Sequence, residues 1–408
     1  MNPTDIHASA AAGIDQDWIA RARRLTPILD AAAPRIEATR SLPPDVLDAL
    51  HEAKLFRMLL PRSLDGAELD LATFFQVVCA IAEGDASTAW CVSQSSGCAM
   101  AAAYLEPPAA REIFGNPRAV VAWGYPAAQC RAARVDGGWK VSGTWGFGSG
   151  NRHAAWLGGH CQLVDAPGQP PERTMLFPRA QASIKDDSWN VIGLRGTGSD
   201  TYAVTDLFVP ARYAVVARAS GRDLPQAADA VAEAEPERRE QGTLYRFSPT
   251  SVYQSGFAGV ALGIARAMLN SFIALAKQKT PAGTNSPLRD SNTIQARIAL
   301  SEARLGSVRA WLIEIQRAMW EECVATGKVG FEHRIKLRLA STHAIHEARE
   351  VVEASYVDAG ATAIFEGNPF ERRLRDMHAA SQQIQSSPAH FQSVGQHYLG
   401  LKPNSRFI

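Results

Sequence analysis

A histidine near the C-terminus, His378, is the first residue whose type and surroundings could do chemistry. It stands in "ERRLRDMHAASQQIQ", residues 371–385, where a cluster of charges is followed by small and amide side chains. An imidazole changes charge near neutral pH and can donate or move a proton during a reaction. On residue type alone, His378 is equally a hydrogen-bonded histidine at an interface.

A glycine-rich segment in the middle of the chain offers a second group of candidates. In "GTWGFGSGNRHAAW", Ser149 lies between Gly148 and Gly150, so its hydroxyl and backbone N–H could reach a closely approaching ligand. The simpler interpretation is a turn residue, because Gly-Ser-Gly is common in turns. The segment "GLRGTGSD", which holds Thr197 and Ser199, contains GxG but not the GxGxxG of a dinucleotide-binding turn.

Other candidates have a simpler structural explanation beside the functional one. Trp90 could form the aromatic wall of a site, although a tryptophan on an apolar helix belongs by default to the core. The segment 343–350 carries two histidines and two glutamates at helical spacing, but the sequence offers no partner cluster, so we predict no metal. The arginines at 372, 373 and 375 are expected to pair with neighbouring acids, which are Glu366, Glu371 and Asp376.

Composition narrows the classes of partner. The chain has 408 residues, with 42 basic and 41 acidic side chains and a net charge of +1, which gives no reason to expect nucleic acid or an anionic membrane. Six cysteines are scattered without a CxxC pair, as is typical of reduced thiols in a cytoplasmic protein. No secretory leader and no stretch of about 20 apolar residues is present. We therefore expect a cytoplasmic protein.

The elements that must position these residues fall into regions of different hydrophobic period. Residues 1–117 have a helical period, and residues 118–216 have the period of two that is typical of strands. Within the second region, Trp139, Val141, Gly143, Trp145 and Phe147 alternate with smaller or polar residues, which predicts one shared face. Residues 217–242 indicate a surface linker, and residues 243–408 predict a four-helix bundle. The sequence thus predicts an α+β protein.

The order of these regions, and local sequences within them, resemble the acyl-CoA dehydrogenase superfamily. The resemblance runs from about residue 20 to 400 and includes "LPPDVLDALHEAKLFRMLLP", "DSWNVIGLRGTGSDTYAVTDLFVP" and "NPFERRLRDMHAASQQIQ". It implies an N-terminal helical domain, a central β-barrel or sandwich, and a C-terminal four-helix bundle. Relatives with this fold assemble as homotetramers, so a homotetramer is implied as well.

The superfamily contains two chemistries, and the sequence resembles one of them more. Dehydrogenases commonly carry a carboxylate base in a Tyr-Glu-Gly stretch before a Gln-Ile-Gln-like end, but His378, Ala379 and Ala380 stand there. The "GTWGFGSGNRHAAW", "GLRGTGSD" and "RDMHAAS" segments instead resemble the two-component flavin monooxygenases of group D, such as the 4-hydroxyphenylacetate hydroxylase oxygenases. That resemblance implies reduced flavin (FMNH2 or FADH2) delivered by a separate NAD(P)H:flavin reductase, O2, and hydroxylation of an aromatic or heteroaromatic molecule through a C4a-hydroperoxyflavin. The alternatives are an acyl-CoA dehydrogenase with an atypical base and a flavin-free scaffold.

The same resemblance implies roles for individual residues. His378 would donate to the peroxide or move a proton, and Ser149 would offer its hydroxyl and N–H to flavin N5 and C4. Cys98 stands where related phenol hydroxylases often carry a histidine, which favours a substrate other than a simple phenol. Trp90 and Cys98 would contact the substrate. The residues implied to contact flavin are Trp90, Trp145, Gly148, Ser149, Gly150, Thr197, Ser199, Arg246, Arg375 and His378.

Overall fold

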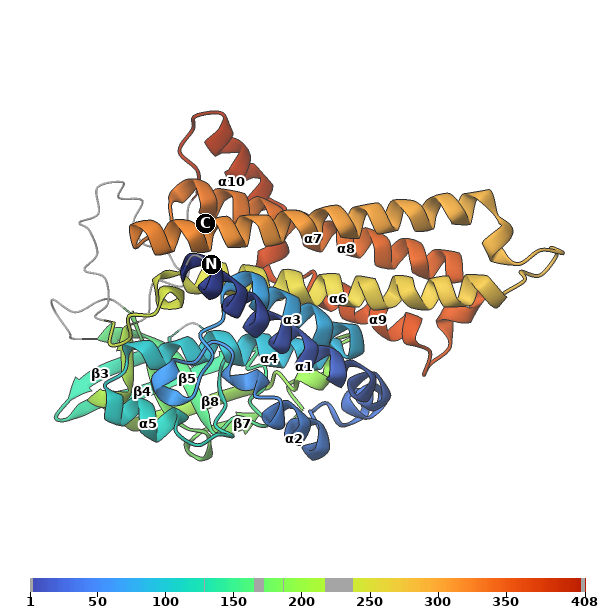
Figure 1. Ribbon diagram of the computed structural model, residues 1–408. Coiled ribbons are helices and arrows are strands. Elements are labelled where there is room, and N and C mark those ends of the chain that lie inside the picture. Colours follow the sequence, from blue (N-terminus) through green and yellow to red (C-terminus); the bar gives the residue numbers. More distant parts are fainter. Residues whose placement is uncertain (1–2, 128, 165–171, 186, 217–237, 405–407) are drawn as a thin grey trace.

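The computed structural model describes residues 3–127, 129–164, 172–185, 187–216, 238–404 and 408. Helices come first, a sheet follows, and long helices complete the chain, as the sequence predicts (Figure 1). Most of the predicted linker, residues 217–237, lies outside the described residues. The division into domains stays a prediction, although the strands fall between 121 and 216, inside the predicted central region.

The N-terminal region consists of short and long helices, which bury most of their apolar side chains between residues 16 and 114. An aspartate caps two of them: Asp70 accepts from the backbone N–H groups of Ala72 and Thr73, and Asp85 accepts from that of Thr88. The helix between these caps packs against the first helix on one side and against the C-terminal bundle on the other. The helices here are α1 (Pro3–Thr39), α2 (Pro44–Glu52), α3 (Leu71–Gly84), α4 (Ala86–Ala99) and α5 (Pro107–Phe114).

Nine described strands form one sheet in the order β7-β8-β4-β3-β5-β6-β9, with β1 beside β5 and β2 beside β4. Strands β4 and β8 are antiparallel, and their register pairs Trp145 with Tyr202. The end of β4 therefore lies beside the start of β8. The strands are β1 (Val121–Trp123), β2 (Tyr125–Pro126), β3 (Arg131–Val135), β4 (Gly138–Gly146), β5 (Trp156–Val164), β6 (Glu172–Pro178), β7 (Ser183–Lys185), β8 (Thr201–Pro210) and β9 (Ala214–Val216).

The alternation predicted along β4 holds only as far as Trp145. Trp145 is fully buried and stacks on Tyr202, but the strand ends at Gly146. Phe147 adopts a φ of 56°, and its side chain is 67% exposed. A positive φ in a bulky residue is a strained conformation that concentrates at functional sites. The turn after β4 is therefore the first place to look for a site.

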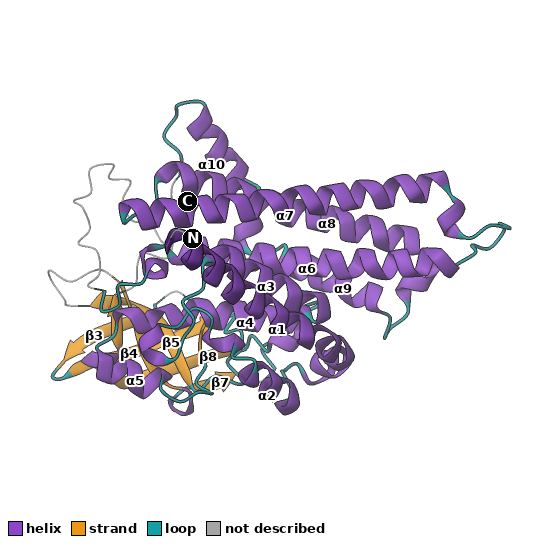
Figure 2. Cartoon of the chain, viewed as in Figure 1, coloured by secondary structure: helices purple, strands orange, loops and turns teal. Residues whose placement is uncertain are grey.

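The C-terminal region contains the predicted four-helix bundle, which extends away from the sheet (Figure 2). Helix α6 packs against α3, α8 and α9, and α7 packs against α8. By length and composition α6 could span a membrane, but 67% of its most apolar window is buried inside the protein. The helices here are α6 (Pro249–Gln278), α7 (Asn292–Thr326), α8 (Phe331–Ala359), α9 (Pro369–Ala380) and α10 (Ala389–Tyr398).

Candidate active site

A chain of buried side-chain hydrogen bonds joins four of the predicted site residues. The Nε1 atom of Trp90, on α4, donates to Ser149 Oγ at 3.1 Å. Ser149 Oγ lies 2.7 Å from Ser199 Oγ, which lies 2.7 Å from Thr197 Oγ1. Thr197 Oγ1 donates to the carbonyl oxygen of Leu194 at 2.8 Å. Because β4 and β8 are neighbours, the turn after one and the segment before the other meet at this point.

The direction of every hydrogen bond in this chain is fixed. Three short oxygen–oxygen contacts need three hydrogens, and the three hydroxyl groups supply one each. The carbonyl of Leu194 has no hydrogen, so the Thr197 hydroxyl must point to it. Ser199 must then donate to Thr197, and Ser149 must donate to Ser199. Ser149 Oγ accepts from Trp90 and keeps one unused lone pair.

This arrangement changes the role that the resemblance implies for Ser149. Its hydroxyl hydrogen is committed to Ser199, and its backbone N–H donates to the carbonyl oxygen of Phe147 at 2.8 Å. The amides of Gly148 and Gly150 are also bonded, to Asp200 and Thr197. Ser149 therefore presents an acceptor where a donor was expected.

The two glycines beside Ser149 are required by packing against protein. A Cβ atom on Gly148 would lie 2.9 Å from the ring of Tyr202 and 3.0 Å from the carbonyl oxygen of Asp200. Gly150 has a φ of +80°, which disfavours other residues, and a Cβ there would lie 3.1 Å from His153 Nε2. The expected reason, close approach of a flavin ring, is not needed to explain either glycine.

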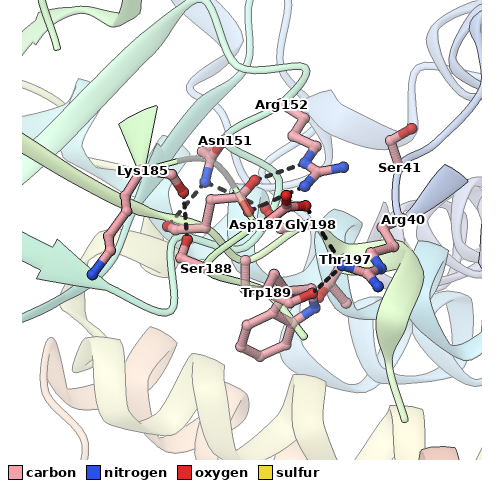
Figure 3. Close-up of polar contacts among 12 residues, drawn as sticks. Arg40, Ser41, Asn151, Arg152, Lys185, Asp187, Ser188, Trp189, Thr197 and Gly198 are labelled. Carbon is pink, nitrogen blue, oxygen red and sulfur yellow. Dashed lines mark hydrogen bonds and ion pairs between the residues drawn. The ribbon is translucent and has the colours of Figure 1, made fainter. Parts of the chain in front are cut away.

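Charged and amide side chains that sequence reasoning missed hold the two segments together. Arg152 forms a two-point pair with Asp200, at 2.6 and 3.1 Å, and Asn151 Nδ2 donates to the carbonyls of Gly198 and Asp200 (Figure 3). The backbone N–H of Leu194 donates to Asp376 Oδ1 on α9 at 2.6 Å. Burial raises the pKa of Asp376 to about 7. The sequence signal for the Arg152–Asp200 pair was a glycine-rich segment that ends in a base, "GSGNR", and a later one that ends in an acid, "GTGSD".

Buried polar atoms without a partner gather beside the same turn. Asn151 Oδ1 and His153 Nε2 have no hydrogen-bond partner. Desolvation lowers the pKa of His153 to about 4, so its imidazole is neutral. The outer side of the turn carries an exposed aromatic ring, since Phe147 is 67% exposed and lies edge-on to Trp189 at 5.9 Å. A flat ring system with one polar edge, such as a flavin, fits a free acceptor bordered by an exposed aromatic ring.

Three aromatic rings lead away from the hydrogen-bond chain. Trp90 lies 4.4 Å from Phe257 between ring centroids, and Phe257 stacks on Tyr253 at 5.9 Å. Both partners belong to α6, and sequence analysis did not single them out as site residues. Cys98, the predicted substrate contact, is buried on α4 and lies near Tyr253. Trp90 and Cys98 are thus brought to the same side of α4 as these rings.

The predicted catalytic histidine occupies a more exposed position. His378 lies on α9 with 41% of its side chain exposed, and its Nε2 is 3.6 Å from Glu353 Oε1 on α8. Its helix reaches the hydrogen-bond chain through the bond between Asp376 and Leu194. No contact between His378 and Ser149 joins them within the described residues. The catalytic role of His378 stays a prediction.

The three remaining predicted flavin contacts have structural partners. Arg375 pairs with Glu371 at 2.7 Å, as the simpler interpretation expected, and also with Glu37 at 2.6 Å. Arg372 and Arg373 pair instead with Asp30 on α1, which the sequence did not indicate. Arg246 Nη1 donates at 2.8 Å to the carbonyl oxygen of Gly327, the residue that follows and caps α7. Trp145 Nε1 donates to the carbonyl oxygen of His160 inside the sheet domain. Their flavin contacts stay predictions.

Comparison with known proteins identifies the family. Residues 22–106 match the acyl-CoA dehydrogenase N-terminal domain, and residues 255–388 match its C-terminal domain. The chain is 30% identical over 366 residues to an indole-3-acetate monooxygenase of Pseudomonas putida, covering 89% of each chain. It is 28% identical to the flavin-dependent monooxygenase oxygenase subunit HsaA of Rhodococcus jostii, covering 89% of this chain and 93% of that one. The crystal structure of 3-HSA hydroxylase from Rhodococcus sp. RHA1 superposes with a TM-score of 0.85 at 26% identity, covering 96% of this chain and 99% of that one.

These matches, together with the helix–sheet–helix order, place the chain in the acyl-CoA dehydrogenase superfamily. Within that superfamily it belongs to the oxygenase components of the two-component flavin-dependent monooxygenases, as the sequence predicts.

Proposed function

We propose that this oxygenase component accepts reduced flavin, FMNH2 or FADH2, from a separate NAD(P)H:flavin reductase and hydroxylates an aromatic or heteroaromatic small molecule. Reduced flavin, when bound, supplies the two electrons with which one oxygen atom of O2 enters the substrate and the other leaves as water. The names of relatives that act on indole-3-acetate and 3-HSA support an aromatic substrate. The name "oxygenase subunit" supports a separate reductase.

The single observation that carries the proposal is the unused lone pair of Ser149. Reduced flavin has a hydrogen on N5, whereas oxidised flavin has a bare nitrogen there. An oxygen that can only accept forms a hydrogen bond with the reduced form and faces a second acceptor in the oxidised form. The ordered chain from Trp90 to Leu194 keeps the Ser149 hydroxyl turned away, so the site distinguishes the two redox states.

The residues around the Ser149 turn have distinct roles in this proposal. Trp90 and Ser199 fix the orientation of the Ser149 hydroxyl, and Arg152 and Asp200 fix the two backbone segments. The exposed ring of Phe147 offers an apolar face that excludes water from one side of a flat ligand. His378 remains the proposed group that moves a proton, because it is the histidine on the helix bonded to this segment.

Anaerobic titration with reduced and with oxidised flavin, for both FMN and FAD, tests the proposal. We expect the wild-type protein to bind the reduced form more tightly. Ser149→Ala should lower that preference about fivefold, because one hydrogen bond to N5–H is worth about 1 kcal/mol. Ser142→Ala is the matched control, since Ser142 lies on β4, the strand that precedes the Ser149 turn, and bonds Asp206 at the exposed side of the sheet. Equal binding of the two redox forms by the wild type would contradict the proposal.

We also propose that the protein is a homotetramer. Several apolar side chains on the bundle are more than half exposed in one chain, and neighbouring chains of a tetramer would cover them. They are Leu300, Val324, Val357, Ile364 and Phe365. Light scattering should give four chains per particle, and a stable monomer at micromolar concentration would contradict the proposal. The cytoplasm remains the proposed compartment, supported by six buried free cysteines.

A further inference from the structure

The hydroxyl of Tyr253, in the first turns of α6, is buried and has no hydrogen-bond partner. Trp123 and Cys98 lie close enough to influence its pKa, but neither forms a hydrogen bond of acceptable geometry with it. Leaving a buried hydroxyl unpaired costs free energy, so such a group needs an explanation, and an absent ligand is one.

The position of Tyr253 is fixed by close packing between α4 and α6. A Cβ atom on Gly97 would lie 2.8 Å from the tyrosine ring, so the ring occupies the space that any other residue at 97 would fill. One turn further along the seam, a Cβ on Gly256 would lie 2.0 Å from Ser93 Oγ. The ring therefore cannot move toward α4 to find a partner for its hydroxyl.

Tyr253 stands at the far end of the aromatic rings that begin at Ser149. Its ring stacks on Phe257, Phe257 contacts Trp90, and Trp90 donates to Ser149. A flat substrate that lies along these rings would place one end near the flavin turn and the other end near the Tyr253 hydroxyl. This geometry depends on the proposed function, because it takes the Ser149 turn as the place of the flavin.

The ionisable groups at this end are neutral. Desolvation raises the pKa of the Cys98 thiol and of the Tyr253 phenol well above their ordinary values. Neither group can therefore take a proton from a substrate at neutral pH. What Tyr253 can do is donate one hydrogen bond and accept another.

We propose that Tyr253 is a substrate-binding residue, whose hydroxyl forms a hydrogen bond with a polar group on the ring of the aromatic substrate and so orients that ring toward the flavin turn. The substrate is held in its neutral form. Its chemical class is an electron-rich aromatic or heteroaromatic compound, preferably of fused rings, with a hydroxyl, carbonyl or ring N–H at the end distant from the hydroxylated carbon.

Equilibrium binding of two ligands of equal shape tests this role without flavin or oxygen. The ligands are 2-naphthol and 2-methylnaphthalene, which differ by a hydroxyl in place of a methyl group. We expect the wild-type protein to bind 2-naphthol about tenfold more tightly, the effect of one hydrogen bond. Tyr253→Phe keeps the stacked ring and should abolish the preference while leaving the affinity for 2-methylnaphthalene unchanged.

The matched control is Tyr245→Phe, which removes a buried phenolic hydroxyl that donates to the carbonyl oxygen of Leu59. This variant should keep the tenfold preference and lose thermal stability, whereas Tyr253→Phe should not lose stability. Retention of the preference in Tyr253→Phe, or weak and equal binding of both ligands by the wild type, would overturn the proposal. This binding assay contains no flavin. Its outcome therefore does not depend on whether the protein prefers reduced flavin, and the two proposals can fail separately.

Discussion

Asp376 offers the sharpest test of how the C-terminal bundle holds the site. Its carboxyl is buried, and its Oδ1 accepts the N–H of Leu194, the residue that ends the ordered hydrogen-bond chain. Burial is the largest cause that raises its pKa from 3.8 to about 7. The charged groups around it are Asp85, Glu37, Arg372 and Arg373. The informative substitution is Asp376→Asn, which keeps an acceptor oxygen but cannot ionise.

The sign of the effect follows from proton linkage. Between pH 4 and 7 the folded protein holds the Asp376 proton and the unfolded chain has lost it, so folding stability falls as the pH rises. The difference between a pKa of 3.8 and one of about 7 corresponds, at about 1.36 kcal/mol per pKa unit, to roughly 4 kcal/mol as an upper limit. Above pH 7 both states are ionised and the difference stays constant. Asp376→Asn should therefore become more stable relative to the wild type as the pH rises from 4 to 7.

Comparison of variant and wild type is needed because buried histidines act in the opposite direction. Desolvation lowers the pKa of His51, His153 and His390 to about 4, so they destabilise the folded protein as the pH falls from 6.5 toward 4. Their contribution is common to both proteins and cancels in the difference.

The assay is the apparent unfolding temperature of both proteins at half-unit steps from pH 4 to 8. Asp45→Asn is the control, because Asp45 is exposed and its hydrogen bond from Arg35 lowers its pKa, which places its titration below this window. Parallel curves for the wild type and Asp376→Asn would refute the reasoning.

Three further substitutions separate structural from functional roles. Trp90→Phe should cost about 1 kcal/mol of folding stability, measured by chemical denaturation, because Ser149 Oγ loses its buried donor. Arg246→Met should lower the unfolding temperature through loss of its bond to Gly327 at the end of α7, and a weakened affinity for reduced flavin would instead support the predicted flavin contact. His378→Ala should bind reduced flavin normally yet release more hydrogen peroxide per product formed; unchanged coupling would make this histidine structural.

Much of the fold could be predicted because hydrophobic period changes sharply along the chain. The segments that form α3 and α6 are so apolar that other helices must cover them on most sides, and they pack against each other. The period of two in β4 predicted a strand but not its end. Phe147 continues the alternation in sequence, whereas its positive φ turns it outward. Alternation records a local preference and carries no information about where a strand stops.

The sequence predicted which residues belong to the candidate site better than it predicted how those residues are arranged. Short polar residues near glycine, such as Ser149, Thr197 and Ser199, were found from segments 143–156 and 193–200. Tyr253 and Phe257 were missed as site residues, because helical spacing predicts burial without showing which neighbour a buried face meets. Trp145 was also predicted to contact flavin; it is buried in the core of the sheet domain and stacks on Tyr202, and its flavin contact stays a prediction.

The role of Ser149 shows why residue type alone cannot settle chemistry. A serine hydroxyl can donate or accept, and the sequence leaves both open. The choice is made three hydrogen bonds away, at the carbonyl oxygen of Leu194, which has no hydrogen and forces every hydroxyl in the chain to point toward it. A substitution that removes the Thr197 hydroxyl should free Ser199 and then Ser149 to reverse. Thr197→Val should therefore weaken the preference for reduced flavin although it leaves Ser149 itself in place, and an unchanged preference in this variant would show that the order of the chain does not decide the redox state that binds.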